Sequence, residues 1–173
     1  HEFRYMSNDK LAAVSLPYGN GGYAMTVILP NNGLSVSDVM KPMSSKDFAA
    51  IDNAMTDCLV DLKLPRFTTE TELPLNDVIS ELGAPTMFMP GKADFSNMCK
   101  QDMHVSKMLQ KAKIEVNERG TKAAAVTAAI MMMSALQPEQ PKRVSFHANR
   151  PFAYIITDRA DGAILFMGQF TGE

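Results

Sequence analysis

The chain has 173 residues, of which 46% are hydrophobic, and its formal net charge is −2. This length and apolar content suit a globular protein with a sizeable core and exclude a disordered one. The near-neutral charge gives no reason to expect nucleic acid or an anionic membrane as a partner, and no apolar run in the sequence is long enough to span a bilayer.

The first fifty residues are predicted to form a β-meander followed by two short helices. Two runs of strand-forming residues, 11–16 and 23–29, flank a Gly-Asn-Gly-Gly turn at 19–22 that is typical of a hairpin. We expect one helix that ends at Met40 and another that ends near Ala54, because serine is a favoured N-cap residue. The candidate caps are Ser35 or Ser37 for the first helix and Ser44 or Ser45 for the second.

The middle of the chain is predicted to alternate extended segments with one short helix. Apolar and polar side chains alternate over residues 57–64, which indicates a half-buried strand. Pro65 interrupts this strand, and we expect extended chain over 66–71. A helix is predicted over 75–82, because apolar residues recur there at helical spacing and Gly83 ends the pattern.

Strands dominate the remainder. We expect one long strand over about 103–118, whose apolar residues alternate with polar ones and whose exception is Gln110. Residues 144–146 are short and extended. Two nearly continuous apolar runs, 152–156 and 163–167, have the composition of strands buried on both faces. Together these elements predict an α+β fold with many strands and few helices.

No motif in the sequence argues for an enzyme. There is no phosphate-binding glycine loop and no nucleophile elbow. His1, His104 and His147 lie far apart without the spacing of metal ligands, so neither a metal nor a cofactor is predicted. Cys58 and Cys99 are expected to be free thiols, buried or half buried, since two cysteines make no disulfide framework.

Three motifs together resemble the serpin family. Residues 118–127, ERGTKAAAVT, are similar to the serpin hinge, and the resemblance continues in FHANRPF at 146–152 and ILFMG at 164–168. It covers essentially all 173 residues, in order. The resemblance implies a serpin-like fold of mostly antiparallel sheets, with 23–30 in the family's B sheet and 57–65 in its C sheet.

The resemblance also implies that residues 1–173 are the C-terminal portion of a single serpin domain. The large N-terminal helices of a serpin and the first three strands of its sheet A have no counterpart in this sequence. The strand over 103–118 would feed the reactive loop at about 119–143. That strand would then lack a neighbour, so we expect self-association by strand exchange or edge pairing.

A serpin inhibits by acting as a suicide substrate of serine proteases. The protease cleaves the reactive loop and forms an acyl-enzyme, and the loop then inserts into sheet A and distorts the trapped protease. The resemblance assigns six residues to the hinge: Glu118, Gly120, Thr121, Ala123, Ala124 and Ala125. Gln110 takes the position where many serpins carry a shutter histidine, and glutamine cannot titrate near neutral pH.

The composition of the hinge fits insertion, although its alanines would also suit a helix. If the segment becomes a central strand, alternate residues face opposite sides. One face then carries only small side chains: Thr121, Ala123, Ala125, Thr127 and Ala129. Gly120 supplies backbone freedom, and no proline between Thr121 and Leu136 blocks the hydrogen-bond ladder.

The sequence defines the position of the scissile bond less narrowly than that of the hinge. The usual spacing from the hinge places it after Ser134, before Ala135. A longer loop would shift it, so the residue before the bond could instead be Met131, Met132, Met133 or Leu136. All of these side chains are small or apolar, which favours target proteases with elastase-, chymotrypsin- or subtilisin-like pockets.

Two other functions are compatible with the sequence. A non-inhibitory serpin could act as a carrier, chaperone or storage protein, but such members tend to have bulky, charged or proline residues in the hinge. Without the resemblance, the chain would be an α+β interaction module. Serpins are often secreted, which implies a secreted or extracytoplasmic location; two unpaired cysteines neither require nor exclude it.

Overall fold

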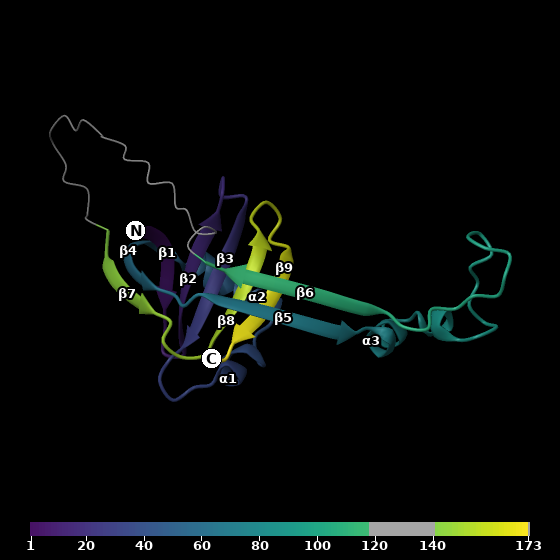
Figure 1. Cartoon of the computed structure of the whole chain (residues 1–173). Coiled ribbons are helices and arrows are strands. Elements are labelled where there is room, and N and C mark those ends of the chain that lie inside the picture. The colour runs from purple at the N-terminus through teal and green to yellow at the C-terminus, as the bar shows by residue number, and fades with distance from the viewer. Residues whose placement is uncertain (118–140, 173) are drawn as a thin grey trace. The chain divides into compact units, whose positions relative to one another are not determined.

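The computed structural model describes residues 1–117 and 141–172, and Figure 1 shows the course of the chain. Contacts divide it into two compact units. The larger comprises His1–Phe67 and Val116–Glu173, and the smaller comprises Thr68–Glu115. No helix in the described part of the chain is long and apolar enough to cross a membrane.

A seven-stranded sheet forms the larger unit, in the order β7-β4-β1-β2-β3-β8-β9. Its strands are β1 (Glu2–Ser7), β2 (Leu11–Tyr18), β3 (Tyr23–Pro30), β4 (Thr56–Lys63), β7 (Arg143–His147), β8 (Phe152–Asp158) and β9 (Ile164–Phe170). The described pairings in this sheet are antiparallel except β4 with β7, which is parallel. The segments that the resemblance assigned to two sheets, β3 and β4, lie in this one sheet, because β1 and β2 connect them.

The predicted hairpin is confirmed as β2 and β3, which pair along their full length from Leu11↔Pro30 to Tyr18↔Tyr23. Gly19 and Gly21 have positive φ angles of 49° and 84° in the turn, a conformation that favours glycine. The first strand, β1, was not among the predicted elements. Its side chains are half buried at three successive positions, so its sequence does not alternate cleanly.

The two predicted N-terminal helices are α1 (Val36–Met40) and α2 (Ser45–Ala54). Each begins with a capping box in which the serine and aspartate side chains accept each other's backbone N–H groups. The pairs are Ser35 with Asp38 and Ser44 with Asp47, so of the candidate caps the structure selects Ser35 and Ser44. The helices bury Val36, Val39 and Ile51 in a cluster with Ala13, Ile28, Ala153 and Ile155 of the sheet.

The opposite face of β8 packs in an aromatic cluster. The Phe67 ring lies 5.6 Å from that of Phe152, 5.4 Å from that of Tyr154 and 5.2 Å from that of Phe170. Strand β8 is therefore buried on both faces, as its continuous apolar run predicts. The same prediction is wrong for β9. Residues 164–167 of β9, the last strand of the described sheet, are 42–62% exposed.

The smaller unit is built on the paired strands β5 (Phe67–Pro74) and β6 (Leu109–Val116), which run side by side in Figure 1. Between them lie α3 (Asn76–Glu81) and a 3₁₀ turn, Pro85–Phe88. The helix predicted over 75–82 is thus confirmed, and Gly83 follows it with a φ of 106°.

The long strand predicted from residue 103 begins only at Leu109. The preceding backbone groups have partners outside a strand ladder. Met108 donates its N–H to Asn76 Oδ1 over 2.8 Å and accepts from the Leu75 N–H over 2.9 Å. Val105 donates to the Met87 carbonyl over 2.9 Å. These bonds bind 105–108 to the segment around α3 and thereby delay the start of β6.

Candidate functional site

The predicted hinge and reactive bond lie outside the described residues. These are Glu118, Gly120, Thr121, Ala123, Ala124 and Ala125 for the hinge, and Met131, Met132, Met133, Ser134, Ala135 and Leu136 for the bond. The structure describes the two strands nearest to this segment in the chain. Strand β6 ends at Val116 before it, and β7 begins at Arg143 after it.

Strand β6 presents a charged face and a half-buried face. On the charged face, Lys111 Nζ lies 2.9 Å from Glu72 Oε2 and Lys113 Nζ lies 2.7 Å from Glu70 Oε1. The hydrogen bond from Lys113 holds the pKa of Glu70 below its usual value, and the same bond raises the pKa of Lys113. These exposed pairs lie across β5 and β6 and oppose a slip in their register.

Gln110 lies at an exposed position of β6. By strand alternation it belongs to the same face as Ala112, Ile114 and Val116, which are half buried. The described residues do not bring it together with a second predicted site residue, since the others lie within 118–136. Its shutter role therefore stays a prediction.

Strand β7 is tied to β4 along its whole length. The parallel register runs from Leu59↔Arg143 to Lys63↔His147. At one end the Leu59 N–H donates to the Lys142 carbonyl over 2.9 Å, and at the other the Ala148 N–H donates to the Lys63 carbonyl over 2.8 Å. Phe146 points inward, is 1% exposed, and packs edge-on against Tyr5.

A side-chain pair links the same two strands on their outer face. His147 Nε2 lies 2.9 Å from Asp61 Oδ2. The hydrogen bond from His147 is the main cause of a lowered pKa at Asp61, with smaller contributions from nearby cations. The two residues are 86 positions apart in the chain. The sequence predicted a strand over 57–64 and an extended segment over 144–146, but it gave no signal that these two side chains meet.

A second contact that the sequence did not reveal explains part of the FHANRPF motif. Arg150 follows β7 and donates from Nε to the Pro30 carbonyl at the end of β3, over 2.9 Å. The arginine thus connects the turn between β7 and β8 to the hairpin of the central sheet. This part of the motif therefore has a structural role in joining these two segments.

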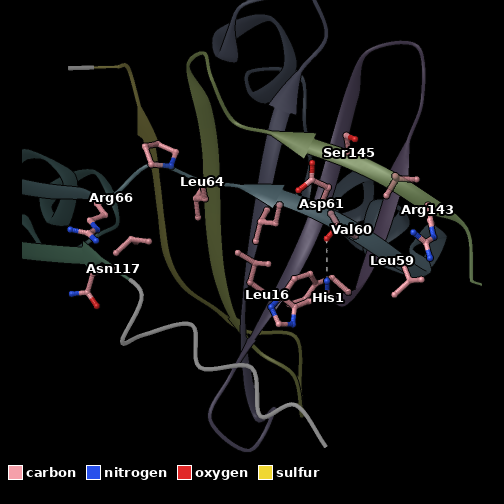
Figure 2. A pocket seen from close by; sticks show the side chains of 15 residues that line it. His1, Leu16, Leu59, Val60, Asp61, Leu64, Arg66, Asn117, Arg143 and Ser145 are labelled. Atoms are coloured by element: carbon pink, nitrogen blue, oxygen red, sulfur yellow. Dashed lines mark hydrogen bonds between the residues drawn. The ribbon is translucent and has the colours of Figure 1, made fainter. Parts of the chain in front are cut away.

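A cavity of about 1010 Å³ lies within the larger unit, beside β4 and β7 (Figure 2). Its apolar lining includes Leu16, Val60 and Leu64. Arg66 and Asn117 lie at one end of the cavity and Arg143 at the other, as Figure 2 shows. The lining mixes aliphatic and charged side chains. Within the described residues, no group of three or more His, Cys, Asp or Glu side chains could hold a metal ion.

Comparisons with known proteins agree on one family. The serpin family model, described as "serine protease inhibitor", matches residues 1–172. The chain is 37% identical over 158 residues to glia-derived nexin of Rattus norvegicus, which covers 90% of this chain and 38% of the nexin. It is 32% identical over 177 residues to the leukocyte elastase inhibitor of Homo sapiens, which covers 98% of this chain and 45% of the inhibitor.

Solved structures support the same fold. The native state of tengpin, a thermophilic serpin, superposes with a TM-score of 0.74 at 28% identity and covers 100% of this chain and 45% of tengpin. The chain spans about two fifths of the length of the curated relatives it matches. The description of the family is that of an inhibitor and not of an enzyme. At the level of the family, this agrees with a sequence in which no catalytic motif was found.

Proposed function

The chain belongs to the serpin family, and from this premise we propose that it carries the inhibitory segment of a serpin that traps serine proteases covalently. The target protease attacks the reactive loop at about 119–143 and forms an acyl-enzyme. The cleaved loop then enters a sheet as an additional strand and carries the protease with it. Residues 1–173 would be one portion of a single serpin domain.

The observation that carries this proposal is the small, uncharged face of the hinge sequence. Thr121, Ala123, Ala125 and Thr127 would all point inward from an inserted strand. Small side chains can pass beneath covering elements without the overpacking that costs about 1–3 kcal/mol per misfit. A buried, unpaired charge would cost several kcal/mol, and this face has none.

The two strands that flank the reactive loop in the chain, β6 and β7, support the proposal. Among the described residues, β6 pairs with β5 alone, so its other edge offers backbone groups to a further strand. On the far side of the segment, β7 is held by β4 and by the bonds at residues 142 and 148. One end of the loop thus adjoins an edge that can accept a strand, and the other end adjoins a fixed strand.

We place the scissile bond between Ser134 and Ala135, with Met131, Met132, Met133 and Leu136 as alternatives for the residue before it. Small or apolar residues at this position suit elastase-, chymotrypsin- or subtilisin-like pockets. The similarity to a protein named leukocyte elastase inhibitor supports the elastase-like preference. Gln110 would act in the shutter that opens the sheet.

A matched pair of charged substitutions in the full-length protein tests the insertion step. Ala123→Arg places a charge on the inward face, and Ala124→Arg places the same charge on the outward face. We expect Ala124→Arg to form SDS-stable complexes with elastase, chymotrypsin or subtilisin as the unmodified protein does. Ala123→Arg should be cleaved as an ordinary substrate, with at least tenfold less complex, because about 1.4 kcal/mol already changes a partition tenfold.

Two results would refute trapping by insertion. One is cleavage of the unmodified protein without any SDS-stable complex. The other is equal complex formation by the two arginine variants, since an outward and an inward charge would then be equivalent. Mass spectrometry of the released peptide in the same reactions identifies the scissile bond.

We further propose that the free edge of β6 allows this chain to self-associate when it is produced alone, through edge pairing or strand exchange. Light scattering of residues 1–173 that gives a strictly monomeric mass at all concentrations would exclude this self-association.

A secreted or extracytoplasmic location is also proposed, on the basis of the family alone. Fractionation of the source cells would decide between the medium and the cell interior.

A further inference from the structure

Two asparagine–glycine pairs lie in turns of the larger unit. Asn20–Gly21 lies in the turn between β2 and β3, and Asn32–Gly33 follows β3. An asparagine before a glycine is prone to lose its side-chain amide, because the next backbone nitrogen can attack the side-chain carbonyl carbon and glycine has no Cβ to hinder the approach. The attacking nitrogen must first be free of other partners. The hydrogen bonds of each turn therefore decide its reactivity.

The first pair is held by hydrogen bonds. The Gly21 N–H, which would have to give up its proton, donates to the Tyr18 carbonyl over 2.7 Å. Asn20 Oδ1 accepts from the Gly22 N–H over 3.0 Å, which holds the side chain in place. The turn is also bound from outside, since the Arg159 N–H donates to the Gly22 carbonyl over 2.9 Å. Attack at this pair must first break bonds that the folded chain maintains.

The second pair lies at the tip of a turn whose ends alone are bound. The Leu34 N–H donates to the Asn31 carbonyl over 3.1 Å, and the Asn31 N–H donates to the Lys10 carbonyl over 2.9 Å. Asn32 and Gly33 lie between these bonds and are exposed. Among the described residues, neither the Gly33 N–H nor the Asn32 side chain has a hydrogen-bond partner. The space around Gly33 is open, because a Cβ built there would meet nothing within 4 Å.

We propose that Asn32 is a site of spontaneous deamidation in the folded protein and that Asn20 is protected. The Gly33 nitrogen gives up its proton and forms a bond to Asn32 Cγ. The bond from Cγ to the side-chain nitrogen then breaks, and ammonia leaves. Water opens the resulting succinimide at either of its carbonyl carbons, which gives aspartate or isoaspartate. No group is oxidised or reduced, and water is the only other reactant.

Either product changes the segment that joins β3 to α1. Each adds one carboxylate to a chain whose formal net charge is −2. This carboxylate arises shortly before Ser35, the N-cap of α1. Isoaspartate also lengthens the backbone inside the turn that the bond from Leu34 to Asn31 closes. The proposal concerns the chemical ageing of the chain and does not require that the protein inhibit a protease.

Peptide mapping by mass spectrometry of the full-length protein, incubated at pH 8, tests the proposal. Amide loss at the two asparagines is followed in native buffer and in urea that unfolds the chain. In native buffer we expect about tenfold faster loss at Asn32, because opening the hydrogen bonds of the other turn slows attack at Asn20 by roughly this factor. In urea the two rates should become similar, since both asparagines precede a glycine.

A matched pair of variants checks the assignment of the product. Asn32→Gln should abolish it in the peptide that contains residue 32, since glutamine would have to close a larger ring. Asn20→Gln should leave the rate at Asn32 unchanged. Both side chains are exposed, so neither substitution should disturb the fold.

Three results would overturn the proposal. The first is the absence of amide loss at Asn32 in the folded protein over a period in which the unfolded chain loses it. The second is an equal or faster rate at Asn20 in native buffer. The third is a difference between the two sites that persists unchanged in urea, since the fold could not then be its cause.

Discussion

At the scale of single residues, the Tyr154 side chain explains why residue 168 is a glycine. Gly168 lies opposite Tyr154 in the β8–β9 register. The Tyr154 ring is 1% exposed and occupies the space where a side chain at 168 would begin. A Cβ at this position would lie 2.5 Å from Tyr154 Cζ, well inside van der Waals contact. The glycine is therefore required by a close approach and not by backbone conformation.

Gly168→Ala should accordingly destabilise the fold by about 1–3 kcal/mol, because the buried tyrosine must shift to admit one methyl group. Urea unfolding followed by circular dichroism measures this as a lower midpoint. Met167→Ala is the control in the same strand, since Met167 is 62% exposed and its truncation should have little effect. Equal midpoints for Gly168→Ala and the unmodified protein would contradict the packing seen around Tyr154.

At the scale of elements, the pairing of β5 with β6 depends on charge as well as on backbone hydrogen bonds. A two-stranded sheet is marginally stable by itself. The pairs Glu70–Lys113 and Glu72–Lys111 add cross-strand attraction along one face. From Glu70 to Glu72 the residue numbers rise along β5, whereas from Lys113 to Lys111 they fall along β6. This is the order of antiparallel strands. Each pair is exposed, so neither contributes much, but together they oppose a slip in register.

Lys111→Glu should loosen this pairing, because it places two carboxylates opposite each other. We expect about two- to fivefold faster amide exchange in β6, the range of an exposed charge pair. The swapped variant Glu72→Lys with Lys111→Glu should regain most of the protection. If the swap exchanges as fast as the single variant, the side-chain pair does not hold these strands.

The contribution of the Glu70–Lys113 pair to the β5–β6 pairing has a defined pH range. The pKa of Glu70 is lowered, so its contribution is complete above the ordinary value of 4.5 and is lost as the pH falls through the lowered value. The pKa of Lys113 is raised, so its contribution is complete below the ordinary value of 10.5 and is lost as the pH rises through the raised value. Salt at 1 M should weaken the pairs throughout this range.

At the scale of the whole molecule, the fold combines a well-buried centre with open edges. Strands β3 and β8 lie between the helix-covered cluster and the aromatic cluster. In contrast, β9 and the unpaired edge of β6 leave apolar side chains or backbone groups open within the described chain. Among the described residues, the unpaired edge of β6 is compatible with the added strand that the proposed function requires.

We therefore expect that a single cut near residues 131–136 makes the full-length protein more stable. A new central strand adds roughly ten backbone hydrogen bonds at about 1 kcal/mol each, which corresponds to a rise in Tm on the order of 20 °C. Calorimetry before and after brief subtilisin treatment measures this rise. An unchanged or lower Tm in the cleaved protein would show that the loop does not insert.

Elements with local causes can be predicted from the sequence alone. The hairpin of β2 and β3 follows from two apolar runs and a glycine turn. Helices α1 and α2 follow from their serine caps, and α3 ends before Gly83. The sequence also determined the family, because the hinge, FHANRPF and ILFMG motifs are specific in combination. The reactive bond stays a prediction, since it lies outside the described residues.

Features that depend on distant partners become visible only in the folded chain. Bonds from 105 and 108 to residues around α3 delay the start of β6 to Leu109. An apolar run gives no information on whether its strand lies at the centre or the edge of a sheet. For this reason β9 was predicted to be buried, whereas its residues are exposed in the structure. The same holds for Asp61 and His147, which are brought together by the parallel pairing of β4 with β7. The physical reason is that register and burial arise from pairing between segments far apart in the chain, which no local pattern encodes.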